Sequence, residues 1–271
     1  MATNQYYFTL KGSWRRFLRE MRYSNTPTWT LIEVGKFWDT VKDYDDINEE
    51  LYTYDRRFSN SFKLAEKYLP RHDYTLLDIQ SRSGKGSIYW QQKGKLKRAV
   101  CVDFSDYLSS LAKRRLMNSG LDFQSLKIDR FPLVFADGCF NFICSYETVE
   151  HVCDYGDMIS ELTRVLTNEG IMIVTCPNRS WEWVHCLSVV ININHSEGPH
   201  RFLKRKELLD CFRQNGLKVL EENTTILLPF NHPWSFAVNN FLERNLSERI
   251  KRYLALRRTF ILKKTLPVKT L

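Results

Sequence analysis

The sequence has 271 residues, of which 43% are hydrophobic and 14% aromatic, and its formal net charge is +9. This length fits one large domain or a domain with a cap. No run of about 18 apolar residues is present, which disfavours a membrane-spanning helix, and the first residues lack the apolar core of a secretory signal. Seven cysteines without a CxxC pair disfavour a disulfide framework, a zinc site and a cysteine-ligated iron–sulfur cluster. We therefore expect a cytoplasmic protein.

The first 70 residues are aromatic and charged and show no clear strands. Residues 58–69 have the apolar periodicity of an amphipathic helix that ends at Pro70. We expect residues 1–70 to form a helical cover, or lid, on one edge of a main domain that spans residues 71–271.

From residue 74 onward, apolar runs alternate with helical patterns. Helices are predicted at 105–117, 158–166 and 204–214, with a helical insertion at 229–256. Strands are predicted at 76–79, 99–102, 126–129, 140–145, 171–176, 217–228 and 258–263. Strands alternating with helices predict a Rossmann-like, doubly wound α/β fold with a mostly parallel seven-stranded sheet. The last strand, which follows the insertion, is expected to pair antiparallel at the sheet end.

The stretch 74–103 carries the first sign of a ligand site. A short apolar strand bears Asp78 near its end, a turn rich in Ser, Arg and Gly follows, and the next strand stops at Asp103. A strand, a tight turn before a helix and an acid that ends the next strand together form a nucleotide-type cradle.

Four stretches in this order resemble the class I S-adenosylmethionine-dependent methyltransferases, and among them the small-molecule branch that includes quinone and lipid-like methyltransferases. They are LLDIQSRSGKGS (76–87), AVCVDFSDYLSSLAKRR (99–115), KIDRFPLVFADGCFNFICSYETVEHV (127–152) and ELTRVLTNEGIMIVTCPN (161–178). Each stretch alone is a weak signal, but their order and spacing together are a strong one. The resemblance covers roughly residues 76–220.

The resemblance implies S-adenosylmethionine as the cofactor and assigns its contacts. Asp78 would orient the turn and the cofactor's ammonium group, and Asp103 would accept both ribose hydroxyls. Phe104 would lie along the adenine, and Asp129 would accept the adenine amine with backbone from Arg130 beside it. The turn positions Gln80, Arg82 and Gly84 would hold the amino acid end of the cofactor, and Tyr146 and Glu147 would line the methyl position.

The turn departs from the family pattern at two positions. The family has glycine where this chain has Gln80 and Arg82, and Gly84 alone of the three keeps the expected residue. Arg82 is expected to pair with the cofactor's carboxylate in place of a backbone cradle. The alternative is a degraded site on a non-catalytic relative, against which the preserved acids argue.

Three histidines are candidates for the catalytic base. His151 follows the fourth strand, where ligands of open parallel sheets bind, and His195 and His200 lie in the segment NHSEGPHRF. Packing, loop capping and surface hydrogen bonding are the alternative roles of these side chains. No metal ligand set is predicted.

The acceptor is predicted only by class. Methyltransferases that act on the amines of nucleic acid bases carry an Asn/Asp-Pro-Pro-aromatic tetrad where this chain has SYET, and a Pro-Cys nucleophile is absent. Nucleic acid is therefore disfavoured, and a small-molecule or lipid-like acceptor is expected.

The charge of the C-terminal part suggests a second contact. Between residues 241 and 271, nine Lys and Arg residues stand against two Glu residues. A solvated helix face has this pattern, as does a surface that attracts an anionic partner. Residues 240–264 are thus a candidate for peripheral membrane contact, although their apolar residues would equally suit the protein's own core.

A non-catalytic S-adenosylmethionine-binding or partner-binding module with the same fold stays open. A nicotinamide-dependent dehydrogenase is disfavoured because no G-x-G-x-x-G follows the first strand.

Overall fold

A computed structural model describes residues 14–265 except 16, 21, 23–27, 50–51, 70–72 and 191–197. The described part of the first 70 residues is helical, with α2 (Leu31–Asp39), α3 (Tyr44–Glu49), α4 (Tyr52–Ala65) and the short 3-10 helix η1 (Glu66–Tyr68). A capping box explains the start of α2. The Thr30 side chain accepts a hydrogen bond from the Glu33 N–H, and the Glu33 carboxylate accepts one from the Thr30 N–H.

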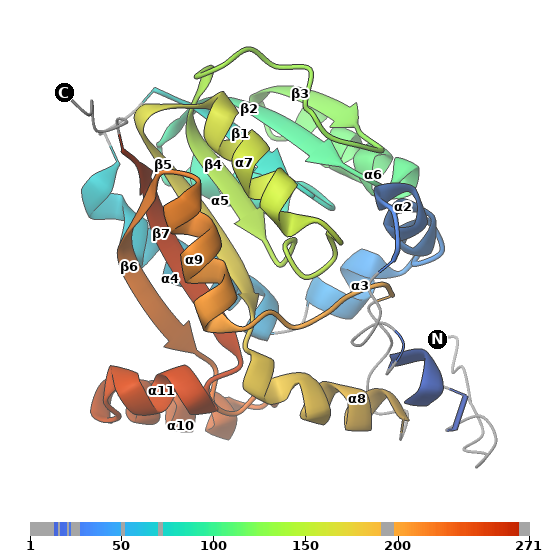
Figure 1. The fold of residues 1–271 in the computed structure, drawn as a ribbon, viewed down its shortest axis with the longest axis vertical. Helices are drawn as coiled ribbons and strands as arrows, with labels where there is room; N and C mark the ends of the chain where they lie inside the picture. The colour runs from blue at the N-terminus through green and yellow to red at the C-terminus, as the bar shows by residue number, and fades with distance from the viewer. Residues whose placement is uncertain are drawn as a thin grey trace.

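The centre of the molecule is a seven-stranded sheet (Figure 1). Its strands are β1 (Tyr74–Ile79), β2 (Leu96–Asp103), β3 (Asp122–Lys127), β4 (Phe140–Tyr146), β5 (Leu166–Pro177), β6 (Leu217–Thr225) and β7 (Arg257–Lys264). The order in space is β3-β2-β1-β4-β5-β7-β6. β7 pairs antiparallel with both β5 and β6, and the remaining neighbours pair in parallel. The predicted fold and the antiparallel pairing of the last strand are confirmed, but β7 lies between β5 and β6, so β6 and not the last strand ends the sheet.

Helices cover both faces of the sheet. They are α5 (Lys85–Gln92), α6 (Asp106–Met117), α7 (Tyr155–Val165), α8 (Glu182–Val190) after the 3-10 turn η2 (Arg179–Trp181), α9 (Arg205–Gln214), α10 (Pro233–Asn245) and α11 (Glu248–Leu254). In Figure 1, α7 and α9 lie in front of the sheet and α4 and α5 lie behind it. Because both faces are covered, most residues of β1 and β4 and residues 170–177 of β5 are buried.

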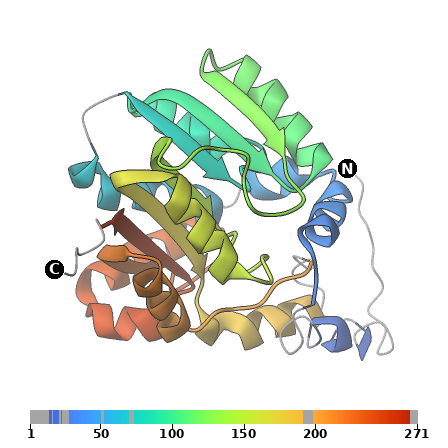
Figure 2. The same ribbon diagram turned by 45° about the horizontal axis from the view of Figure 1, so that its top comes forward.

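The cover helix α2 packs tightly against the start of α6. At Gly35, an added Cβ would lie 2.1 Å from the Phe104 carbonyl oxygen, so glycine is required for this close approach. Asp39 Oδ1 accepts hydrogen bonds from the Ser105 hydroxyl at 2.7 Å and from the Tyr107 N–H at 3.0 Å. A carboxylate at a helix N-terminus is stabilising, so Asp39 fixes α2 on α6. In Figure 2 the blue helix α2 meets the green helix α6.

Three helices extend from the carboxyl edge of the sheet. α8 follows the end of β5, while α10 and α11 follow the end of β6, and all three lie along the bottom of the molecule in Figure 1. Among the residues that the structure describes, no helix has the length and apolar character needed to cross a bilayer.

Candidate active site

Two buried aspartates end the two neighbouring strands β1 and β2. Asp78 Oδ2 accepts a hydrogen bond from the Ser87 hydroxyl at 2.8 Å. Asp103 accepts one bond from the Arg82 N–H at 2.7 Å and another from the Ser105 N–H at 2.9 Å. Burial raises the pKa of Asp78 to about 7 and the pKa of Asp103 to about 6. Burial of these carboxyl groups lowers the stability of the fold when they are ionised, and carboxyl groups with such perturbed pKa values are candidates for a functional site.

The turn between β1 and α5 has the backbone of a glycine-rich loop. Gln80, Arg82 and Gly84 have φ values of 53°, 54° and 77°, all in the left-handed region that glycine favours. For Gln80 and Arg82 this conformation costs roughly 1–2 kcal/mol each. The chain therefore keeps the shape of the loop at a cost, although it has lost two of the glycines.

The Arg82 side chain fills the space above this loop. Its guanidinium donates to the Glu147 carbonyl at 2.6 Å and to the Tyr44 hydroxyl at 3.3 Å, and it lies 5.1 Å from the centre of the Trp38 ring. Trp38 belongs to α2 and Tyr44 to α3, so Arg82 joins the helical cover to the loop and to the end of β4.

Gln80 belongs to the same loop and is almost fully buried. Neither its amide oxygen nor its amide nitrogen has a hydrogen-bond partner among the described residues. Buried polar atoms are normally paired, so this amide marks a place where a polar ligand would be stabilised.

Tyr146 and Glu147 lie at the end of β4. The Tyr146 hydroxyl accepts a hydrogen bond from the Trp90 indole at 2.8 Å, which turns it toward the core. The Glu147 carboxylate forms an ion pair with the buried Arg257 at 3.1 Å. Glu147 also has a positive φ of 51°, a strained backbone that is common at ligand-binding positions.

Two of the three predicted histidines lie close together. The ring centres of His151 and His200 are 6.3 Å apart, and both side chains are buried. His151 Nδ1 donates to the Pro199 carbonyl at 2.9 Å, and its ring meets Trp38 edge-on at 5.7 Å. His195 lies outside the described residues.

The predicted adenine contacts differ in burial. Phe104 is buried under α2, whereas Asp129 and Arg130 are exposed in the loop that follows β3. The apolar run at 126–129 predicted a strand that would end at Asp129, but β3 spans 122–127 and the acid lies two residues beyond it.

Sequence reasoning did not find three side chains that meet these residues. Tyr44 and Trp38 hold Arg82 from the cover, and His185 of α8 lies 4.8 Å from His200, measured between ring centres. Trp38 and Tyr44 belong to an acid-rich stretch and His185 to an apolar helix, so no local pattern marked them.

S-adenosylmethionine, which the sequence resemblance implies, can be tested against this arrangement. The carboxylates at the ends of β1 and β2, the left-handed turn and the orphaned Gln80 amide suit its ammonium, ribose and amino acid groups. The space beside the turn is only about 10 Å³, which is room for about one water molecule. The polar groups of the site therefore suit S-adenosylmethionine. The space is too small to hold it, so Arg82 and the covering helices must move for the cofactor to bind.

A larger cleft of about 800 Å³ opens on the other side of Phe58. It lies between α4, α5 and α10 and is lined by aromatic and polar side chains. Among them are Tyr52, Arg56, Phe58, Lys85, Tyr89 and Phe236. Phe58 also borders the small space beside the turn, so the two spaces share this side chain.

Comparison with known proteins agrees with the resemblance seen in the sequence. Residues 77–174 match a family described as a methyltransferase domain. Over 102 residues the chain is 31% identical to a ubiquinone biosynthesis O-methyltransferase of Bartonella quintana, an alignment that covers 35% of this chain and 41% of that protein. The chain thus matches less than half the length of this relative.

Solved structures share the fold at low identity. A putative methyltransferase in complex with the Trm112 activator of Haloferax volcanii aligns with a TM-score of 0.61 and 18% identity, over 86% of this chain and 98% of that one. The [4+2]-cyclase SpnF aligns with a TM-score of 0.62 and 15% identity, over 88% of this chain and 97% of that one. These likenesses establish the fold alone.

Residues 77–174 thus match a methyltransferase domain, and the sheet has the fold of class I S-adenosylmethionine-dependent methyltransferases. The resemblance to the quinone-type branch is also confirmed. The cofactor of this class of domain is S-adenosylmethionine.

Proposed function

We propose that the protein transfers a methyl group from S-adenosylmethionine to a small-molecule or lipid-like acceptor. The observation that carries the proposal is the pair of buried aspartates, Asp78 and Asp103, at the carboxyl ends of adjacent parallel strands around a left-handed turn. Ligands of open α/β sheets bind at this edge. The bound cofactor would supply an electrophilic methyl group on a cationic sulfur.

The cofactor contacts follow from the position of each residue. Asp103 has two carboxylate oxygens for the two ribose hydroxyls, and Asp78 lies where it attracts the ammonium group. Gln80 and Gly84 would hold the amino acid end from the turn. The remaining proposed contacts are Phe104 along the adenine, Asp129 and Arg130 at its amine, and Tyr146 and Glu147 near the methyl group.

Cofactor entry requires Arg82 to leave its present place. Its contacts with Tyr44, Trp38 and the Glu147 carbonyl hold α2 and α3 on the loop. In the proposal, residues 1–70 act as the lid, and the guanidinium turns to the cofactor's carboxylate when the lid opens. Arg82 then binds the cofactor's carboxylate through its side chain, because this loop lacks the glycines that would let its backbone bind that group.

His151 is the proposed base for the acceptor proton, and His200 and His195 remain the alternatives. The Pro199 carbonyl can only accept a hydrogen bond, so His151 Nδ1 carries a proton. In the neutral ring the lone pair is then on Nε2, the atom that could take a proton.

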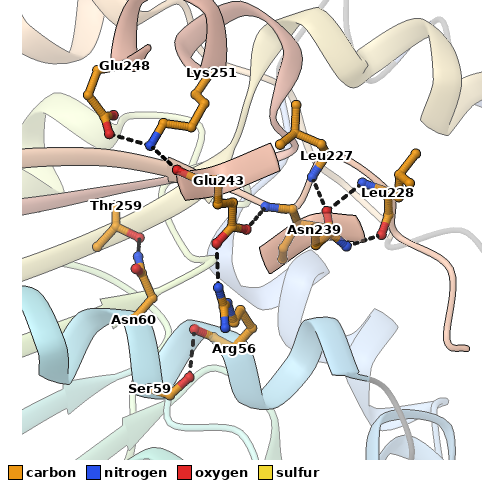
Figure 3. A network of polar contacts seen from close by, with 11 residues as sticks. Arg56, Ser59, Asn60, Leu227, Leu228, Asn239, Glu243, Glu248, Lys251 and Thr259 are labelled. Atoms are coloured by element: carbon orange, nitrogen blue, oxygen red, sulfur yellow. Dashed lines mark hydrogen bonds and ion pairs between the residues drawn. The ribbon is translucent and has the colours of Figure 1, made fainter. Parts of the chain in front are cut away.

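The helices at the carboxyl edge have inverted polarity, which bears on where the acceptor comes from. In α10 the fully buried side chains are Ser235 and Asn239, while Trp234 and Phe241 are 50% and 64% exposed. Asn239 accepts hydrogen bonds from the N–H groups of Leu227 and Leu228 (Figure 3). The polar face of α10 therefore points into the protein.

The same inversion is present in α11 and in the contacts of α10 with α4. Lys251 of α11 is buried, donates to the Glu243 carbonyl and pairs with Glu248, while Glu243 pairs with Arg56 of α4 (Figure 3). The apolar side chains of this surface are thus left outside, as are those of α8. They are Trp183, Leu187, Phe230, Trp234, Val238, Phe241, Ile250, Tyr253 and Leu254.

Two exposed arginines lie near this apolar surface in the chain. Arg244 and Arg249 are exposed beside Phe241 and Ile250 in the chain. An exposed apolar patch with basic side chains suits the interface of an anionic bilayer. We propose peripheral membrane contact through residues 240–264, widened to α8, on the same edge of the sheet as the cofactor acids. A lipid-like acceptor would then reach the site from the membrane.

A non-catalytic module is the second candidate function, and the filled space above the turn favours it. Titration calorimetry with S-adenosylmethionine, followed by transfer of labelled methyl to a panel of hydroxylated aromatic and isoprenoid compounds, separates the two. Cofactor binding with transfer supports the enzyme. Binding without transfer to any compound supports the module, and absence of binding contradicts the enzyme and a cofactor-binding module alike.

The membrane contact is tested by co-sedimentation with vesicles of neutral or anionic lipid. The wild type is expected to sediment with anionic vesicles, and Phe241→Glu should reduce this binding at least about tenfold, because it puts a charge on the apolar face. Ile32→Glu, at an exposed apolar residue of α2, is the matched control and should bind as the wild type does. Equal binding of the Phe241 variant, or dimerisation that the Phe241 variant abolishes in the absence of lipid, would contradict the membrane contact.

A further inference from the structure

Glu20, His185 and His200 come from three separate parts of the chain and meet beside the candidate active site. Glu20 lies on a helical segment near the N-terminus, His185 lies on α8, and His200 precedes α9. One carboxylate oxygen and one ring nitrogen from each histidine all lie within 4.8 Å of one another. Glu20 Oε2 and His185 Nε2 are 3.9 Å apart, and the two imidazole rings meet edge-on.

The cluster is shielded from solvent. The exposed fraction is 3% for both Glu20 and His200, and 11% for the His185 side chain. Arg19 lies 3.3 Å from Glu20 Oε1, and the other oxygen, Oε2, is the one that faces the histidines.

The tautomer of His200 suits a metal ligand. Its Nδ1 lies 2.8 Å from the Gly198 carbonyl, which can only accept, so Nδ1 carries the proton and Nε2 has the lone pair in the neutral ring. An imidazole whose second nitrogen donates to a backbone carbonyl is the usual arrangement around a metal ion.

We infer that Glu20, His185 and His200 bind a divalent transition metal, with Zn²⁺ as the best match. Two imidazoles and one carboxylate are a known zinc ligand set, which leaves a fourth position open for water or an oxygen ligand. Bonds of about 2.0–2.2 Å bring ligand atoms to roughly 3.3 Å from one another. The present separations of up to 4.8 Å would close by small side-chain rotations.

The site would also stabilise the neighbourhood of His151. The carbonyls of Gly198 and Pro199 hold His200 and His151 respectively, so one short loop links the proposed metal to the proposed base. A metal would tie this loop to α8 and to the N-terminal segment. This inference goes beyond methyl transfer and is read out on the metal itself, so it can fail while the proposed function stands.

The test uses the full chain, stripped with a chelator and titrated with Zn²⁺, with bound metal measured by elemental analysis. One equivalent per chain is expected. His200→Ala and Glu20→Gln should each weaken zinc binding at least about 100-fold, because each removes a ligand. His232→Ala removes an exposed histidine that caps α10 and is the matched control, expected to bind as the wild type does.

Co²⁺ gives a second readout that does not depend on the variants. The stripped wild type should develop the visible absorption of a tetrahedral Co²⁺ complex, and added Zn²⁺ should remove it. The inference is overturned if the wild type holds less than about a tenth of an equivalent of zinc at a several-fold excess of metal. It is equally overturned if the folded Glu20 and His200 variants bind zinc as tightly as the wild type, with folding checked by circular dichroism.

Discussion

Replacing Asp78 by Asn should stabilise the protein at alkaline pH and weaken its cofactor site. Burial raises the pKa of Asp78 from the ordinary 3.8 to about 7, with Asp103 as a further cause, so the fold binds this proton more tightly than the unfolded chain does. The contribution of the protonated group to stability is complete below about pH 4 and is lost as the pH rises through about 7. Asparagine has the shape of the protonated acid and is uncharged at every pH.

The magnitude follows from the interval between the two pKa values. The interval from 3.8 to about 7 corresponds to a loss of about 4 kcal/mol in the free energy of unfolding when Asp78 is fully ionised. Asp78→Asn should therefore raise the free energy of unfolding by about 2–4 kcal/mol near pH 8.5, and by about 1 kcal/mol near pH 4.5. Urea unfolding followed by circular dichroism measures both values.

The matched control is Asp122→Asn, which changes an exposed aspartate of β3. It should leave the pH dependence of stability unchanged. If Asp78→Asn is no more stable than the wild type near pH 8.5, or if its advantage is the same near pH 4.5, the buried charge is not the source of the cost. Titration calorimetry on the same variant should show weaker S-adenosylmethionine binding. Gains in stability that are accompanied by loss of binding are typical of functional residues.

Three further substitutions test other parts of the account. Gly35→Ala puts a Cβ 2.1 Å from the Phe104 carbonyl oxygen, so α2 must shift, and the free energy of unfolding should fall by about 1–3 kcal/mol; an unchanged value would contradict the packing. Glu147→Gln leaves the buried Arg257 without its charged partner and should cost about 3–5 kcal/mol in urea unfolding, whereas a loss under about 1 kcal/mol would mean that another group neutralises the arginine. Asp103→Ala should weaken S-adenosylmethionine binding at least about tenfold in calorimetry, and equal affinity would refute the ribose assignment.

The fold was largely predictable because most of its strands are buried on both faces. Continuous apolar runs at 140–145 and 171–176 identified β4 and β5, and the Ser105 N-cap identified the start of α6. β3 was placed too late because it is an edge strand whose exposed and partly buried residues largely alternate, so its apolar run is short. The antiparallel β7 was predictable from the insertion that precedes it.

The site was predictable only where its residues follow strands. Asp78 and Asp103 end predicted strands, and the turn between them is local. The packing of Arg82 against Trp38 and Tyr44 joins positions about forty residues apart, which no periodicity reveals.

The inverted polarity of α10 and α11 was not predictable for a different reason. The apolar residues of 240–264 repeat at helical spacing whether they face the core or solvent. The buried partners of Asn239 and Glu243, which decide the orientation, come from other elements of the chain.

The central claim is that the left-handed turn and the two buried aspartates bind S-adenosylmethionine in spite of Gln80 and Arg82. Titration calorimetry of the full chain with S-adenosylmethionine and with its demethylated product tests this most directly. Saturable binding of one molecule per chain is expected, with a dissociation constant below about 100 μM. Absence of binding of either compound at several hundred micromolar would contradict it, and would leave the fold without the cofactor for which its acids are arranged.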